Sequence, residues 1–287
     1  MTTRHIKVLA AGLALFCAAG LASALAAGGQ KEIRLGIWPC TSPMKVYRQY
    51  QGLAGFLSKE TGLKVKLVIP KDSEAFFRRV ENNDVDFALQ DANVYSQLAG
   101  NYDPGHLLQA LTSGGEAVEK GVIIVRKDSG LKDIGGLKGK KIIFGDEHSL
   151  TKYITIKRLL AEHGLDLNND LGGHSFGRDC EGIILRVYLK KYDAGVIDNW
   201  SWKELHEPGE QEVNADKLSV VAEGPAVPYW VFAAHNKTDK SLAAGIERAL
   251  LKLNINEPEH REILKSIEIG GFVKTSEADY AMLKSLK

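Results

Sequence analysis

Four hydroxyl side chains stand where predicted strands pass into predicted helices. Thr41 and Ser42 follow the first strand after the amino-terminal region, and Ser149 and Thr151 follow a later apolar strand. Serine is a favoured N-cap residue, and the first N–H groups of a helix have no partner inside it. Hydroxyls, free N–H groups and the positive end of the helix dipole together favour an anion. We predict an anion site here, and simple helix capping is the alternative.

The second of these junctions carries further groups. Lys152 adds a positive charge to the loop, and His148 precedes it. His148 is a candidate for sensing charge or binding the ligand, although a single histidine in a polar loop is more often solvated. Tyr153 starts the apolar face of the helix that follows, together with Ile156 and Leu160.

Carboxylates and aromatic rings complete the set. Asp91 and Glu181 are candidates to accept hydrogen bonds from a protonated ligand oxygen, which would select a partly protonated oxyanion. The alternative is that they only support the ligand-binding groups. Six aromatic residues are candidates for lining a cleft: Trp38, Tyr95, Tyr153, Trp200, Tyr229 and Trp230. We favour Trp38 and Tyr229, because each stands beside a proline-containing turn.

The amino-terminal residues indicate export. Arg4, His5 and Lys7 precede an apolar run from Val8 to Leu21, and small residues then offer a cleavage site. We expect residues 1–26 to be a secretory signal peptide and the mature protein to be periplasmic; an uncleaved anchor is the alternative. Removing Arg4 and Lys7 from the 37 basic residues leaves 35 against 36 acidic ones, so no basic field exists to attract nucleic acid or a membrane surface.

Two cysteines remain outside the predicted signal, Cys40 and Cys180. In an exported chain such a pair normally indicates one disulfide. No C-x-x-C or other metal-ligand spacing occurs, and we expect neither a metal nor a cofactor.

Strands and helices alternate along the chain. Strands are expected at 33–37, 65–69, 85–89, 107–111, 122–125, 141–144, 193–197, 218–222 and 231–234. Helical patterns stand between most of them; the first starts near Met44 and stops at Gly62. A short helix is expected over Leu131, Ile134 and Leu137. This alternation of strands and helices predicts an α/β fold with doubly wound, mainly parallel sheets.

Several segments, in this order, resemble the periplasmic binding proteins of the phosphate, phosphite and phosphonate family. They are Phe56–Val65, Val85–Ala88 with Tyr95, Leu137–Phe144, Ser149–Tyr153 and Tyr192–Val196. The resemblance implies two α/β lobes joined by two crossing strands near Leu111 and Leu218, with a ligand cleft between the lobes. Lobe 1 would comprise residues 27–113 and 220–287, and lobe 2 residues 114–219. An anion would be held by helix N-termini from both lobes.

Some positions depart from the family pattern. The phosphonate binders of the family carry Ser-Thr-Ser-Gly-Tyr where this chain has Ser149-Leu150-Thr151-Lys152-Tyr153, so a hydroxyl is lost and a cation gained. Gln90 and Asp91 replace an aromatic residue and a glycine. Cys180 and Glu181 stand at the positions of a His-Asp pair. Because a disulfide between lobes would lock the cleft, two free thiols facing the ligand become the other interpretation, suited to arsenite, a sulfur oxyanion or a soft metal.

Two functions follow from this resemblance. The first is a monomeric binding protein that delivers a small oxyanion to the permease of an ABC transporter. The second is a periplasmic sensor that binds arsenite or a sulfur oxyanion through Cys40 and Cys180 and signals to a histidine kinase. No GxSxG or HExxH motif and no histidine base beside either cysteine occurs, so we do not expect an enzyme.

Overall fold

The structure is a computed structural model that describes residues 32–207 and 213–286. The predicted signal peptide lies outside the described residues. The chain divides into a segment of residues 1–32 and a compact unit, Ile33–Lys287, and the description below concerns that unit. No helix among the described residues is both long enough and apolar enough to span a bilayer.

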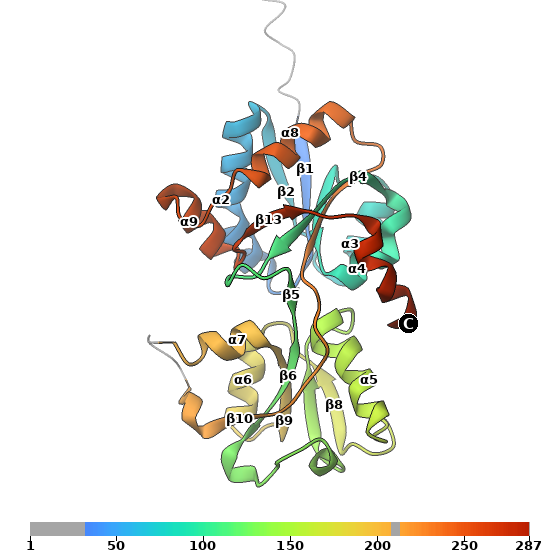
Figure 1. Cartoon of the computed structure of the whole chain (residues 1–287), viewed down its shortest axis with the longest axis vertical. Coiled ribbons are helices and arrows are strands. Elements are labelled where there is room, and N and C mark those ends of the chain that lie inside the picture. Colours follow the sequence, from blue (N-terminus) through green and yellow to red (C-terminus); the bar gives the residue numbers. More distant parts are fainter. Residues whose placement is uncertain (1–31, 208–212, 287) are drawn as a thin grey trace, which may run out of the picture. The chain divides into compact units, whose positions relative to one another are not determined.

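The first of two main sheets has six strands in the order β13-β4-β12-β3-β1-β2 (Figure 1). The strands are β1 (Glu32–Ile37), β2 (Lys64–Val68), β3 (Phe87–Gln90), β4 (Tyr102–Leu111), β12 (Val231–His235) and β13 (Gly271–Lys274). One face packs against α2 (Pro43–Thr61), α8 (Lys240–Leu251) and α9 (Pro258–Ser266). The other face packs against α3 (Ser73–Glu81), α4 (Ala92–Leu98) and the carboxy-terminal 3₁₀ segment η6 (Glu277–Leu286). The sheet therefore has a hydrophobic core on each face.

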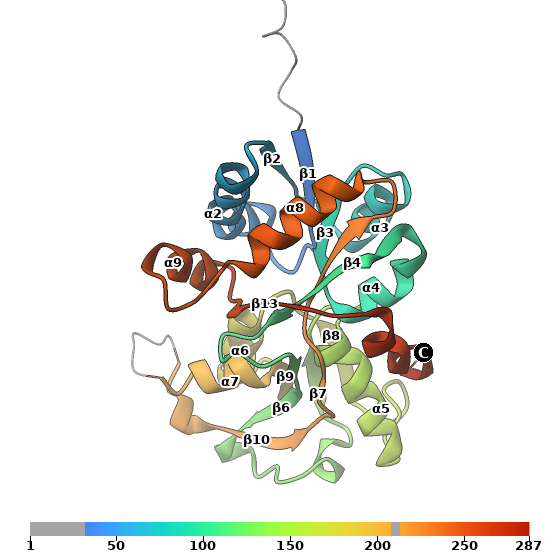
Figure 2. The same cartoon turned by 45° about the horizontal axis from the view of Figure 1, so that its top comes forward.

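The second sheet has five strands in the order β10-β6-β9-β7-β8. The strands are β6 (Gly121–Arg126), β7 (Lys141–Phe144), β8 (Gly173–Phe176), β9 (Ala194–Asp198) and β10 (Leu218–Glu223). Helix α5 (Thr155–Glu162) covers one face, whereas α6 (Cys180–Tyr188) and α7 (Asn199–Glu204) lie on the other (Figure 2). Apart from η1 (Ala99–Asn101), the remaining short 3₁₀ turns belong to this half: η2 (Lys127–Ser129), η3 (Gly135–Leu137) and η5 (Ala215–Lys217). Where one short helix was expected, over Leu131, Ile134 and Leu137, only the single 3₁₀ turn η3 forms.

Two segments connect the sheets. The chain leaves the first sheet after β4 and returns to it between β10 and β12. Along these segments β5 (Val118–Glu119) pairs antiparallel with β11 (Val227–Pro228), which ties the two crossings together. Because β10 pairs with β6 in the second sheet, we propose that the second lobe boundary lies at 224–230; the predicted boundaries otherwise remain a prediction.

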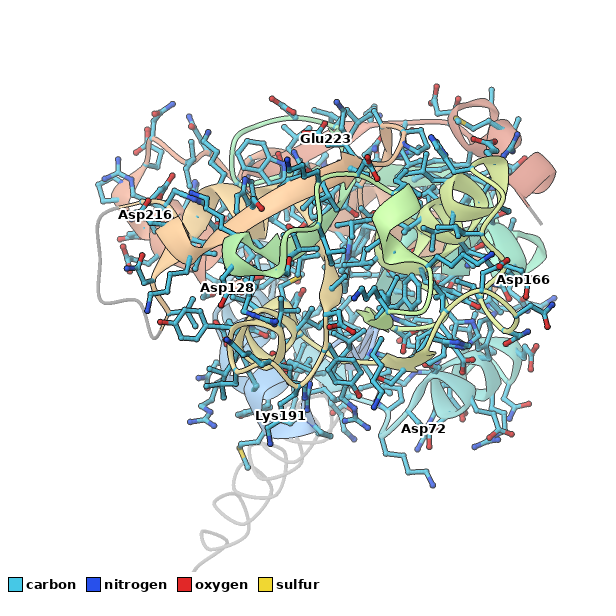
Figure 3. The ribbon with its side chains drawn as sticks, turned by 90° about the horizontal axis from the view of Figure 1, so that it is seen from below. Asp72, Asp128, Asp166, Lys191, Asp216 and Glu223 are labelled. Carbon is cyan, nitrogen blue, oxygen red and sulfur yellow. The ribbon has the colours of Figure 1, made fainter. Side chains whose placement is uncertain are left out.

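Local sequence explains the individual elements. Helix α2 buries Val46, Tyr50, Leu53 and Leu57 and ends where Gly62 adopts φ 69°, a left-handed conformation that glycine favours. Charged side chains such as Asp128, Asp166 and Lys191 point outward (Figure 3).

The sheets are mixed in direction. Pairs β1/β3, β7/β8 and β7/β9 are parallel, whereas β12, β4 and β13 pair antiparallel, as do β10, β6 and β9. Strands β4, β6, β10 and β12, which lead into or out of the two crossings, all pair antiparallel with a neighbour. The predicted α/β class is confirmed, with sheets that are mixed in direction where mainly parallel ones were expected.

Candidate functional site

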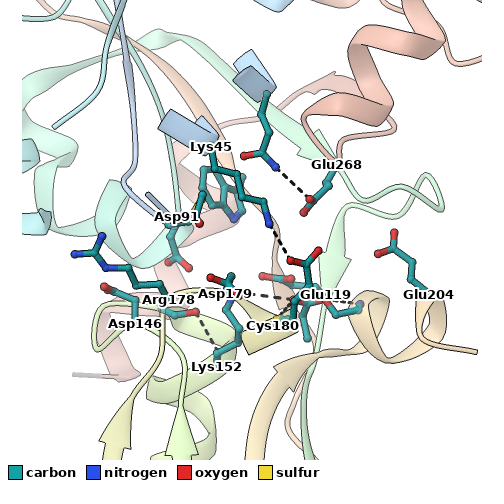
Figure 4. A pocket seen from close by; sticks show the side chains of 18 of the residues that line it. Lys45, Asp91, Glu119, Asp146, Lys152, Arg178, Asp179, Cys180, Glu204 and Glu268 are labelled. Carbon is teal, nitrogen blue, oxygen red and sulfur yellow. Dashed lines mark hydrogen bonds and ion pairs between the residues drawn. The ribbon is translucent and has the colours of Figure 1, made fainter. Parts of the chain in front are cut away.

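A cavity of about 570 Å³ lies between residues of the two sheets (Figure 4). Its lining includes the turn after β1, the loops after β3, β7 and β9, and the start of α6. These loops follow the carboxyl ends of strands, which is where ligands bind in open α/β sheets. The cavity has the size of a small-molecule site.

The first sheet contributes the turn from β1 into α2. Trp38, Cys40 and Thr41 line the cavity, and Thr41 is 7% exposed. Ser42 is the N-cap of α2, and its hydroxyl accepts a hydrogen bond from the Lys45 N–H at 3.4 Å. The Ser42 side chain is exposed and is not among the described residues that line the cavity. Ser42 therefore caps a helix, which was the alternative to anion binding.

The second sheet contributes the loop after β7, which we call the anion loop (residues 149–152). Ser149 caps the π-helix η4 (Leu150–Ile154), which continues into α5, and its hydroxyl accepts from the Lys152 N–H at 3.1 Å. The Ser149 carbonyl accepts from the N–H groups of Tyr153 and Ile154 at 3.2 and 3.0 Å. The bond from the Ile154 N–H spans five residues, which is the pattern of a π-helix. Lys152, in this first turn, lines the cavity.

Asp91 bridges the two halves of the site. Its carboxylate accepts from the Asn93 N–H at 2.8 Å, which caps α4, and from the Leu150 N–H at 3.1 and 3.3 Å. The residue is only 5% exposed. Burial raises the pKa of Asp91 to about 6, although the backbone hydrogen bonds and Lys152 oppose this shift.

Lys152 is the cation at the centre of the site. Its ammonium lies 3.9 Å from a carboxylate oxygen of Asp198, the N-cap of α7. Burial by itself lowers the pKa of Lys152, but the acidic groups around it, Asp198 among them, raise it well above its ordinary value. Burial also raises the pKa of Asp198, but Lys152 and the hydrogen bonds it receives outweigh this and hold it below its ordinary value. The two groups therefore form an ion pair.

Glu119 is the second buried carboxyl at the anion loop. It lies on β5, is 7% exposed, and accepts a hydrogen bond from the Thr151 hydroxyl. Burial and the nearby Asp198 raise the pKa of Glu119 to about 8, so the group is mainly protonated at neutral pH. Burial likewise raises the pKa of Glu204, another lining residue, to about 7.

Both cysteines line the cavity and are free thiols. The Cys180 thiol donates to Asp198 at 3.1 Å. Burial raises the pKa of Cys40 to about 11, and burial with Asp198 raises that of Cys180 to about 12. Both thiols are therefore protonated at neutral pH, which makes them weak nucleophiles. Among the described residues no group of three or more His, Cys, Asp or Glu side chains is arranged to hold a metal ion.

Further contacts join the two sides across the cavity. Lys45 on α2 pairs with Glu181 on α6 at 3.0 Å, and the Asn93 amide donates to the His148 carbonyl at 2.8 Å. The His148 ring packs edge-on against Trp38 and Phe77. Lys45 and Glu181 are solvent-exposed, so this pair contributes at most about 1 kcal/mol. Together these contacts hold the two sides against each other.

The predicted site residues divide into two groups. Nine of them line the cavity: Trp38, Cys40, Thr41, Asp91, Ser149, Lys152, Cys180, Glu181 and Tyr229. Another six, Ser42, Gln90, Tyr95, His148, Thr151 and Tyr153, do not appear in the lining of the described part of the chain. Of the two aromatic candidates that were not favoured, Trp230 lines the cavity and Trp200 is not among the described lining residues. Whether each of the fifteen contacts a ligand stays a prediction.

Packing explains the positions of the second group. Gln90 is buried and accepts from the Tyr102 hydroxyl at 2.9 Å. Tyr95 stacks on Tyr102 in the core. Tyr153 lies edge-on to Phe144 and Phe176, which places it on the far side of the anion loop.

Sequence reasoning missed several lining residues. Asp198 follows the predicted strand at 193–197. The reasoning that selected Ser149, a polar residue where a strand passes into a helix, would also have selected Asp198. Glu119 lies on a two-residue strand in a crossing segment and has no local signal. The other missed charged residues are Lys45, Asp146, Arg178, Asp179, Glu204 and Glu268.

Among the known proteins that this chain resembles are two sequences and a solved structure. The chain is 20% identical over 176 residues to a probable ABC transporter phosphite-binding protein of Prochlorococcus marinus, covering 58% of this chain and 59% of that protein. It is 24% identical over 262 residues to the tetrathionate sensor histidine kinase of Salmonella typhimurium, covering 87% of this chain and 43% of that protein. This chain therefore matches less than two thirds of either relative.

The structure of the Prochlorococcus marinus protein PhnD1 in complex with methylphosphonate superposes with a TM-score of 0.78 at 17% identity, covering 89% of this chain and 97% of that one. This similarity confirms the predicted two-lobed fold. The family described as "ABC transporter, phosphonate, periplasmic substrate-binding protein" matches residues 35–280. This match spans both sheets, both crossings and the cavity, and the chain belongs to the family of periplasmic substrate-binding proteins of phosphonate ABC transporters.

Proposed function

We propose that this protein captures a small oxyanion of the phosphate, phosphite or phosphonate type in the cavity and presents it to an ABC transporter. The observation that carries the proposal is the anion loop, whose half-buried cation Lys152 lines a cavity shared by both lobes. Support comes from PhnD1 of Prochlorococcus marinus, which is described as a probable phosphite-binding protein and whose solved structure is a complex with methylphosphonate. In this proposal the protein binds the oxyanion, releases it unchanged to the transporter and catalyses no reaction.

In this proposal the ligand stabilises a closed form. One lobe offers the anion loop, and the other approaches with the turn at Trp38–Ser42 and with Asp91. Movement occurs about the crossing segments at 112–120 and 224–230. The membrane partner recognises the closed form, which the ligand favours through its contacts with both lobes. The binding protein works as a monomer in the periplasm, exported by residues 1–26.

Thermal unfolding of ligand-free protein tests this function. The panel contains phosphate, phosphite, methylphosphonate, sulfate, thiosulfate, tetrathionate and arsenite under reducing conditions. A ligand at 100 times its dissociation constant stabilises the folded state by about 2.7 kcal/mol and raises the midpoint by several degrees. We expect the largest shift from a phosphorus oxyanion. No shift from any of the three phosphorus compounds would refute the proposal.

A second candidate function is a sensor for a thiophilic ligand. The observation that favours it is that two free thiols, one from each lobe, line the same cavity. A relative that matches 87% of this chain is a tetrathionate sensor kinase. In this alternative Cys40 and Cys180 contact arsenite or a sulfur oxyanion, and the partner is a histidine kinase.

Replacing one thiol separates the two candidates. Under the transport proposal, Cys180→Ser and wild type reach the same midpoint shift at phosphorus oxyanion concentrations that differ by less than about twofold. The reason is that a serine hydroxyl also donates to Asp198. Under the sensor alternative, arsenite or tetrathionate gives the largest shift with wild type and none with Cys180→Ser. The same panel run on both proteins decides between them.

A further inference from the structure

The anion loop already holds a carboxylate that belongs to the chain itself. The Leu150 N–H, the first free donor after Ser149, points to the carboxylate of Asp91 at 3.1 and 3.3 Å. Asp91 comes from the opposite sheet, 59 residues earlier in the sequence. A carboxylate at a helix start is the kind of group such a site binds.

The hydroxyl of the same loop is also engaged. Thr151 is fully buried and its hydroxyl donates to Glu119, so its single hydrogen is not available to a ligand. The Ser149 hydroxyl oxygen accepts from the Lys152 N–H and keeps its own hydrogen for donation. The loop therefore offers an incoming anion fewer donors than its sequence suggests.

The charges of the cavity also disfavour a doubly charged anion. Eight acidic residues line it, Asp91, Glu119, Asp146, Asp179, Glu181, Asp198, Glu204 and Glu268, against the three basic residues Lys45, Lys152 and Arg178. Two of these cations are paired with carboxylates, Lys45 with Glu181 and Lys152 with Asp198. Glu119 is mainly protonated, but a doubly charged anion entering this cavity also meets ionised carboxylates such as Asp91 and Asp198, which cannot donate to it.

We propose that Asp91 determines specificity by acting as a resident anion that competes with the ligand for the Leu150 N–H. A fully ionised oxyanion is repelled by this carboxylate and finds the N–H occupied. An oxyanion that keeps one acidic proton donates that proton to Asp91 and is accepted. This inference rests on the proposed function, because it concerns the same cavity and the same class of ligand.

The inference makes an unusual prediction, that removing a charged carboxylate from the cavity strengthens anion binding. Asp91→Asn removes the charge while keeping an oxygen that caps α4. We expect its affinity for sulfate, which stays doubly ionised at neutral pH, to rise about tenfold or more over wild type. The affinity for methylphosphonate should change less, so the ratio of the two affinities shifts toward sulfate. Isothermal titration calorimetry measures both.

A matched control separates the effect of position from that of charge. Asp72 is the N-cap of α3, accepts from the Ala75 N–H at 2.8 Å, and does not line the cavity within the described residues. Asp72→Asn makes the same chemical change and the same change in net charge on the same lobe. We expect it to leave both affinities at the wild-type values.

A second variant covers the case in which Asp91→Asn does not fold. Asp91→Ser keeps a capping hydroxyl, but its shorter side chain does not reach Leu150. It should show the same gain for sulfate. Circular dichroism of the free proteins establishes folding before titration.

The outcomes distinguish this inference from the proposed function. If wild type binds methylphosphonate and neither Asp91 variant gains affinity for sulfate, the inference is refuted and the function stands. If wild type binds no phosphorus oxyanion but both Asp91 variants gain affinity for sulfate, the inference stands and the proposed function is refuted. An equal gain in Asp72→Asn would also refute the inference, because net charge alone would then explain the effect.

Discussion

Lys152→Met is expected to lower the affinity for the bound oxyanion by about 100-fold or more, which corresponds to roughly 2.7 kcal/mol. Methionine keeps the unbranched shape and most of the length of the side chain but removes the cation of the anion loop. The loss is large because Lys152 is mostly shielded from water and because the carboxylates around it then face the ligand without compensation. Isothermal titration calorimetry with the strongest ligand of the panel measures it.

The same variant should also be less stable without ligand. Asp198 loses its ion-pair partner while remaining largely buried, and its hydrogen bonds from Ser201 and Cys180 compensate in part. We expect a loss of about 1–3 kcal/mol, less than for a fully buried pair because the Lys152 side chain is 22% exposed. Lys157→Met, on the exposed face of α5, is the control and should bind normally. Binding by Lys152→Met at wild-type strength would contradict the assignment of Lys152.

Glu119→Gln is expected to change how stability depends on pH. In the folded protein burial raises the pKa of Glu119 from 4.5 to about 8. Between these values the folded state binds more protons than the unfolded state, so the contribution of Glu119 to stability falls as the pH rises. One proton accounts for a slope of at most about 1.4 kcal/mol per pH unit. Glutamine removes this slope, because it cannot ionise.

Denaturant unfolding from pH 5 to pH 9 measures the difference. We expect the two proteins to have similar stability near pH 5 and the variant to be more stable above pH 8, where wild type carries a buried charge. Other carboxyls with raised pKa values, Asp91 and Glu204, contribute equally to both curves. Glu223→Gln, an exposed residue paired with Lys120, is the control and should follow wild type. Parallel curves for wild type and Glu119→Gln would show that Glu119 is ionised throughout.

Much of the fold follows from local sequence. The predicted strands at 33–37 and 231–234 match β1 and β12 closely, and the helix that starts near Met44 is α2. The short helix expected at Leu131–Leu137 is instead the single 3₁₀ turn η3, where Gly135 and Gly136 interrupt the helical pattern.

The candidate site follows from sequence only in part. Hydroxyl and carboxylate caps were predictable, because an N-cap bonds to a backbone N–H two or three residues away and depends on nothing distant. Ser42 and Ser149 are such caps. The resemblance then indicated which caps border a common cleft, and nine of the fifteen predicted residues line the cavity.

The sequence by itself therefore determined the α/β class, the strand-to-helix junctions and the residues that cap them, since these depend on contacts within a few residues. The tertiary structure alone decided how the donors of the anion loop are used. Asp91 reaches Leu150 across 59 residues, and Glu119 reaches Thr151 across 32. Both depend on two sheets meeting at one cavity. Burial there also sets the charge states, because desolvation raises the pKa of Glu119 while Lys152 remains charged beside Asp198.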